Sequence, residues 1–114
     1  MAMLFAHRKA EKEEQHLFTC LLTDVLKDAE NEKRLILDGK ASRWSKEQIQ
    51  NVVIPEMSEL LDYAGKGEIH FKYGRKQRLL ESSYLITDSA NGLTDTVLGK
   101  DILKLQKLYD SFLE

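Results

Sequence analysis

The sequence is poor in the residues that make disulfides, tight turns and metal sites: its 114 residues include one Cys, one Pro, six Gly and three His. A single Cys excludes a disulfide within the chain, which is typical of a reducing compartment. So few Pro and Gly residues argue against long loops and many tight turns. The apolar run MAMLF at the N-terminus is too short for a signal peptide core, and no run approaches the roughly 20 residues that span a bilayer. We therefore expect a cytoplasmic protein without a membrane span.

Neither sign of charge dominates, because 17 Lys and Arg residues oppose 19 Asp and Glu residues and leave a net charge of −2. This balance excludes a general attraction to nucleic acid or to an anionic membrane. What the chain has in quantity is apolar residues (42%) and charged residues (32%), a composition that favours a soluble helical protein over a disordered one. The length is that of one domain, so we expect a single helical domain over residues 1–114.

Apolar residues at helical spacing predict two helices in the first half of the chain. The first helix is expected over 7–38, with Gly39 as its stop and a break near Asn31 as an open alternative. The second begins at the capping box SKEQ, residues 45–48, and continues past Pro55 with a kink or a fresh start there. The defining apolar positions are Leu17, Leu21, Leu22, Val25, Leu26 and Ala29, then Ile49, Val52, Val53, Met57, Leu60, Leu61 and Ala64.

The segment EIHFKY, residues 68–73, alternates apolar and polar residues as a strand does. We favour a short extended segment here, followed by a third helix over 73–90. The alternative is an α+β fold in which 68–73 pairs with 79–87 as a hairpin. The apolar positions of the third helix are Leu79, Leu80, Tyr84, Ile86 and Ala90.

The last helix is expected to start at a cap formed by Thr94, Asp95 or Thr96 and to run to the end of the chain. Its apolar positions are Leu98, Ile102, Leu105, Leu108, Tyr109 and Phe112. Four helices with short connections predict an all-α, antiparallel four-helix bundle. Because the first helix is longer than the others, its surplus has to project into solvent or pack on a second copy, so we also expect a homodimer.

Residues with catalytic or metal-binding chemistry are few and isolated. Glu13 and His16 have the spacing of half a di-iron site, but the second half is absent, so a solvated helix face is favoured. Cys20 lies four residues after His16 and is interpreted as a small packing residue, and His70 as packing or surface. Phosphate loops, paired-cysteine zinc motifs, nucleophile elbows and dinucleotide fingerprints do not occur. We expect no enzyme, no cofactor and no metal.

The stretch FKYGRKQR, residues 71–78, is the strongest cluster of one charge sign, with aromatic residues beside it. A solvated helix start is the favoured interpretation, and an acidic protein partner or single-stranded nucleic acid are the alternatives. The candidate partner-binding residues are Phe71, Lys72, Tyr73, Arg75, Lys76 and Arg78.

An extended I-x-F segment, Ile69 and Phe71, that leads into a basic helix resembles a feature of some bacteriocin-immunity proteins. The resemblance covers under a quarter of the chain and includes no diagnostic motif. Our leading hypothesis is a non-catalytic helical protein that acts through protein–protein interaction, as a homodimer. The alternatives are nucleic-acid binding through 72–78, which the net charge disfavours, and an immunity-type protective role.

Overall fold

Helices make up most of the residues that the structure, a computed structural model, describes: 12–66, 79–87 and 92–111. The elements in chain order are α1 (Lys12–Leu37), α2 (Lys46–Gln48), the π-helix η1 (Ile49–Val53), α3 (Ile54–Gly65), α4 (Glu81–Thr87), the 3-10 helix η3 (Leu93–Asp95) and α5 (Val97–Asp110). These ranges contain no strand, so the predicted all-α bundle is confirmed. The hairpin alternative is wrong, because most of its second strand forms α4; its first strand, 68–73, lies outside the described residues.

Helix α1 continues without a break past Asn31 and ends where the sequence predicts. Two backbone bonds close its C-terminus: Lys40 N–H donates to the Leu35 carbonyl at 2.9 Å, and Gly39 N–H donates to the Ile36 carbonyl at 3.0 Å. Gly39 has a φ of 78°, the left-handed conformation that this type of cap requires. The predicted start at residue 7 lies outside the described residues.

Helices α2, η1 and α3 follow one another without a loop, and Pro55 lies in the first turn of α3, so the predicted fresh start of a helix at the proline is the alternative that the structure supports. The predicted capping box is confirmed, since the Gln48 backbone N–H donates to Ser45 Oγ at 3.0 Å and the Ser45 N–H to Gln48 Oε1 at 2.8 Å. Proline lacks an N–H and its ring clashes with the carbonyl four residues earlier. The backbone widens into a π-turn just before Pro55, where Ile54 N–H donates to the carbonyl of Ile49.

The third predicted helix, 73–90, is wrong at its start, because residues 79–80 are not helical and α4 begins at Glu81. Glu56 on α3 fixes this start. Its carboxylate accepts hydrogen bonds from the backbone N–H groups of Glu81 and Ser82, each at 2.8 Å. A carboxylate brought from another helix thus replaces the N-cap that the local sequence does not provide. The last residues of the predicted range lie outside the described residues.

Among the three predicted caps of α5, Thr96 is the one used: its Oγ1 accepts from the Gly99 N–H at 2.9 Å. The preceding turn, η3, lies directly against the first turn of α5. A Cβ placed on Gly99 would lie 1.9 Å from the Leu93 carbonyl oxygen, so only glycine fits there.

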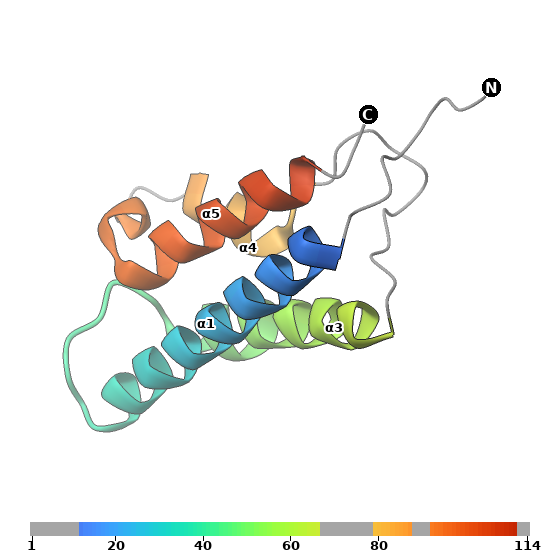
Figure 1. The fold of residues 1–114 in the computed structure, drawn as a ribbon. Helices are drawn as coiled ribbons and strands as arrows, with labels where there is room; N and C mark the ends of the chain where they lie inside the picture. The colour runs from blue at the N-terminus through green and yellow to red at the C-terminus, as the bar shows by residue number, and fades with distance from the viewer. Residues whose placement is uncertain (1–11, 67–78, 88–91, 112–114) are drawn as a thin grey trace.

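In the bundle, α1 packs against α3 on one side and α5 on the other, and α4 packs on α5 (Figure 1). The rings of Phe18 on α1 and Tyr109 near the C-terminal end of α5 stack with centroids 5.8 Å apart. No helix in the described residues is both long and apolar enough to cross a membrane. The buried apolar core consists of Phe18, Leu22, Val25, Ala29, Trp44, Ile49, Val53, Met57, Leu60, Leu80, Ile86, Leu93, Leu98, Ile102, Leu105 and Tyr109.

Most predicted stripe positions are buried or packed against this core, but three large side chains are not. Leu17, Leu79 and Tyr84 are each more than half exposed. Conversely, Phe18 and Trp44 belong to the core although the sequence analysis did not select them. The exposed Leu17 bears directly on the candidate site.

Candidate protein-interaction face

The basic stretch that the sequence analysis selected lies outside the described residues, so its role stays a prediction. The residues concerned are Phe71, Lys72, Tyr73, Arg75, Lys76 and Arg78, together with His70 and the extended segment before them.

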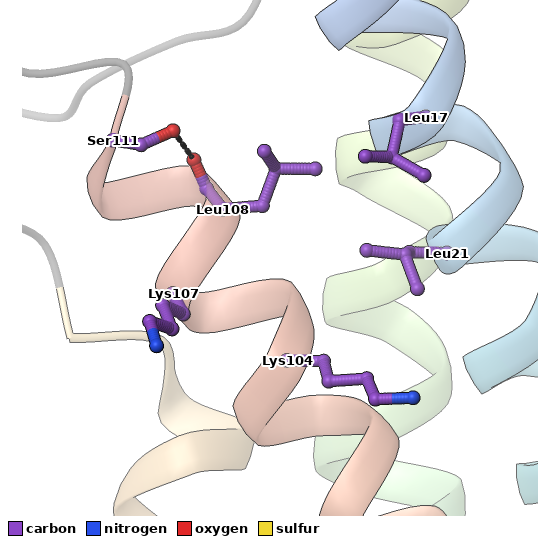
Figure 2. A pocket seen from close by; sticks show the side chains of 6 residues that line it. All are labelled: Leu17, Leu21, Lys104, Lys107, Leu108 and Ser111. Carbon is purple, nitrogen blue, oxygen red and sulfur yellow. Dashed lines mark hydrogen bonds between the residues drawn. The ribbon is translucent and has the colours of Figure 1, made fainter.

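A hollow of about 490 Å³ lies between the N-terminal half of α1 and the C-terminal half of α5 (Figure 2). Leu17 and Leu21 point from α1 toward Leu108 on α5. Leu17 is 51% exposed, and the other two leucines are half-buried. Large aliphatic side chains therefore remain accessible to solvent where the two helices meet. The complete lining is Leu17, Leu21, Lys104, Lys107, Leu108 and Ser111.

Leu17 and Leu21 remain accessible because the apolar arc of α1 is wider than the part of the helix that packs against the core. Phe18 and Leu22 lie on the arc that faces the core and are fully buried. Leu17 and Leu21 precede them by one residue each, which rotates them about 100° around the helix toward the edge. An apolar cluster that the other described residues leave accessible is typical of an interaction surface.

A row of three lysines runs along α5, and two of them, Lys104 and Lys107, line the hollow. Lys100, Lys104 and Lys107 recur at i, i+4 and i+7 and are all exposed, so they share one outer face of the helix. None of the three forms an ion pair with a residue in the described ranges, where the recorded pairs are Arg43–Asp95 and Lys66–Asp62. Like charges at this spacing repel each other slightly, so the row does not help α5 to fold.

On α1 the face that begins with the leucines continues with carboxylates. Asp24 is exposed, and the half-buried Asp28 faces Asp101 on α5. Partial burial, the hydrogen bond to Asp101 and the negative charges of Asp101, Asp24 and Glu32 raise the pKa of Asp28 to about 7. The Oδ2 atom of Asp28 is buried and has no hydrogen-bond partner among the described residues. Among the described residues, no ion pair joins these carboxylates to a cation that would offset their repulsion.

We call this surface the α1/α5 face. It consists of Leu17, Leu21, Asp24 and Asp28 on α1 and of Lys100, Lys104, Lys107 and Leu108 on α5.

A second hollow, of about 610 Å³, lies beside Arg43 and Asp95, and its polar groups bind one another. Arg43 Nη1 donates to the Gly92 carbonyl at 3.0 Å and lies 3.6 Å from Asp95 Oδ2. The Trp44 indole N–H donates to Thr96 Oγ1 at 3.1 Å. These contacts join the loop before α2 to the start of α5, so we interpret the second hollow as structural.

Among the described residues, those with reactive side chains do not assemble into a site. His16 Nε2 lies 3.7 Å from Cys20 Sγ, but this contact is exposed, and the described part of the chain adds no third metal-ligating group to it. The interpretation of Cys20 as a packing residue is wrong, because its side chain points away from the arc that contains Phe18 and Leu22 and is exposed. In the part of the chain that the structure describes, no three His, Cys, Asp or Glu residues are placed to hold a metal ion.

Sequence reasoning did not select the α1/α5 face as a site. The signal was present, since the lysines of α5 recur at i, i+4 and i+7 and the leucines of α1 form a second arc beside the core arc. Comparisons with protein-family models, with curated proteins and with solved structures found no match for this chain. The functional argument therefore depends on the geometry of this face.

Proposed function

We propose that this protein acts without catalysis, by binding another protein through the α1/α5 face. The observation that supports the proposal is the accessible leucine cluster in the hollow, with Leu17 half exposed and lysines along its border. Interfaces commonly combine an apolar centre with a polar, charged rim. Cytoplasmic residence belongs to the same proposal, because the only Cys is unpaired and exposed.

The hollow suits a macromolecule better than a small ligand. Sites for small molecules usually enclose most of the ligand surface, whereas here the leucine at the centre is open to solvent. A helix or a helix pair can cover such an open surface along its whole length. The two other hypotheses, nucleic-acid binding and an immunity-type role, depend on residues 68–78 outside the described residues and stay predictions.

The test substitutes Leu17→Ser and compares it with Leu37→Ser, which replaces a somewhat more exposed leucine at the far end of α1. Both changes replace a largely exposed side chain, so both variants are expected to fold. If the α1/α5 face binds a partner, L17S should weaken the association about tenfold. The partner would cover the exposed half of the Leu17 side chain, and this burial contributes on the order of 1–1.5 kcal/mol. L37S should bind as the wild type does.

The measurement is affinity co-purification from native cells with quantitative mass spectrometry, combined with sedimentation of the purified chain to detect self-association. Equal association of the wild type, L17S and L37S, in both measurements, would show that the leucine cluster is not an interaction site.

A further inference from the structure

The α1/α5 face contains two rows of side chains with the same helical spacing. On α1 the row is Leu17, Leu21, Asp24 and Asp28, at i, i+4, i+7 and i+11; on α5 it is Lys100, Lys104 and Lys107, at i, i+4 and i+7. Members of both rows line one hollow, so both rows face the same side of the molecule. One row ends in carboxylates and the other consists of ammonium groups.

The register of the two helices places opposite charges at the same level. Phe18 stacks on Tyr109 and Asp28 faces Asp101, so α1 and α5 run antiparallel. Counting along both helices from these contacts sets Asp24 level with Lys104. By the same count, Asp28 lies level with Lys100 and Leu21 with Lys107. Even so, no ion pair joins the two rows among the described residues.

We propose that a second copy of this chain covers the α1/α5 face, related by a two-fold axis parallel to α1 and α5. This rests on the proposed function and names its partner. Rotation about such an axis moves no residue along the helix direction, but it exchanges the positions of α1 and α5 across the face. Helix α5 of the second copy therefore lies on α1 of the first. Lys104 of each copy then lies against Asp24 of the other, and Lys100 against Asp28. The leucine clusters of the two copies meet at one end of the interface.

Charge selects this arrangement over the other symmetric one. A two-fold axis perpendicular to the helices would place α1 on α1 and α5 on α5 with the levels reversed, so that the all-lysine row of α5 lies against the same row of the second copy. Like charges placed opposite each other across an interface cost several kcal/mol. The parallel axis instead sets Lys104 against Asp24 and Lys100 against Asp28, and it leaves Lys107 beside the leucine cluster.

The carboxylate cluster on α1 gives independent support. In the single chain the carboxyl of Asp28 carries a raised pKa, and its Oδ2 atom is buried with no hydrogen-bond partner among the described residues. The buried Oδ2 atom is out of reach of a second copy, but an ammonium group over the exposed part of the carboxyl would offset the negative charges around it. The carboxylate cluster and the lysine row each lack an opposite charge among the described residues of one chain. Contact with a second copy would give each of them one.

The test reverses charges one at a time. Asp24→Lys alone sets Lys against Lys at two symmetric places, and Lys104→Glu alone sets carboxylate against carboxylate at two places. Each variant should self-associate about tenfold more weakly than the wild type, or worse. An equimolar mixture of the two variants restores both ion pairs, as does the double variant D24K/K104E, so both should associate again with wild-type affinity. Lys27→Glu, an exposed reversal on another side of α1, is the matched control and should have no effect.

Sedimentation equilibrium at low ionic strength measures each species, and far-UV circular dichroism verifies that every variant is helical. Failure of the mixture and of the double variant to recover would overturn the proposal, as would a D24K chain that associates more strongly, because that result fits α1 packed on α1. A monomeric wild type that still loses a co-purifying protein on Leu17→Ser would overturn the second copy alone and leave the proposed function standing.

Discussion

At Gly99 the backbone of η3 lies against the first turn of α5, and a side chain has no room. A Cβ there would lie 1.9 Å from the Leu93 carbonyl oxygen and 2.9 Å from Thr96 Oγ1, the cap of the helix. Gly99→Ala should therefore lower the free energy of unfolding by about 2–3 kcal/mol, in the range of overpacked sites. Urea denaturation followed by the fluorescence of the single, buried Trp44 measures this change.

The control for this substitution is Gly65→Ala at the end of α3, where a Cβ meets nothing within 4 Å. Alanine favours the helix there, so G65A should be neutral or stabilising by up to about 1 kcal/mol. If G99A is as stable as G65A, the close approach of η3 to α5 does not exist.

Asp28 makes stability depend on pH in a direction opposite to that of most carboxylates. Its pKa in the folded chain is about 7, above the ordinary value of 3.8, so the folded state binds more protons than the unfolded state between these values. Stability should be highest near pH 4, fall as pH rises to 7, and stay level above 7. Asp101 on α5 and Asp24 and Glu32 on α1 are the charges that face this group.

Asp28→Asn should remove this dependence. At pH 8 we expect D28N to be more stable than the wild type by about 1–2 kcal/mol, less than the full pKa shift would give because solvent screens a half-exposed group. At pH 4 the difference should vanish. Denaturation at submicromolar concentration, with Glu30→Gln as an exposed control, measures it; a constant difference from pH 4 to 8 would contradict the assignment.

The neighbours Leu17 and Phe18 show why a sequence pattern identifies a helix more readily than its buried face. Leu17 and Leu21 fit the helical period, and so do Phe18 and Leu22. The position of α5 decides which of the two arcs is buried. Because the ring of Tyr109 on α5 stacks on Phe18, the arc of Phe18 and Leu22 is the buried one. The periodicity of α1 was therefore predictable, but its exposed leucine was not.

At the scale of elements, α4 depends on a cap from a distant part of the chain. Both oxygens of the buried Glu56 accept backbone N–H groups of α4, and Gln106 on α5 accepts the N–H of Leu80 just before it. Glu56→Ala leaves two N–H groups without acceptors and should cost about 2–4 kcal/mol, whereas Glu56→Gln, with one carbonyl oxygen, should cost less.

Amide hydrogen exchange tests this role directly. The amides of Glu81 and Ser82 should exchange much faster in E56A, while amides in the middle of α1 change only as far as global stability does. Glu59→Ala, an exposed change on the same helix, is the control. Unchanged protection at the start of α4 in E56A would show that the carboxylate is not its cap.

Caps made of neighbouring residues were predictable, and caps made across the fold were not. The box of Ser45 and Gln48 and the stop at Gly39 each involve residues within a few positions of one another. The start of α4 was misplaced because its acceptor, Glu56, lies 25 positions away in the sequence. The sequence also did not determine how the backbone accommodates Pro55, since a kink, a new helix start and a π-turn all make room for its ring.

At the scale of the whole molecule, the candidate site depends on charges that come together only on folding. The stretch 72–78 contains four basic residues within seven positions, whereas the lysines of α5 are separated by two or three residues in the sequence. Their alignment in a row, and its position beside the carboxylates of α1, require the antiparallel pairing of two helices from opposite ends of the chain. The sequence predicted a homodimer only from the length of the first helix.

The mass of the wild-type chain in solution tests the central claim most directly. Sedimentation equilibrium at micromolar concentration and low ionic strength should give twice 13.2 kDa. Raising the salt concentration should shift the mass toward 13.2 kDa, because the ion pairs between Asp24 and Lys104 of the two copies are screened. A mass of 13.2 kDa at every concentration and every salt level would contradict a second copy on the α1/α5 face.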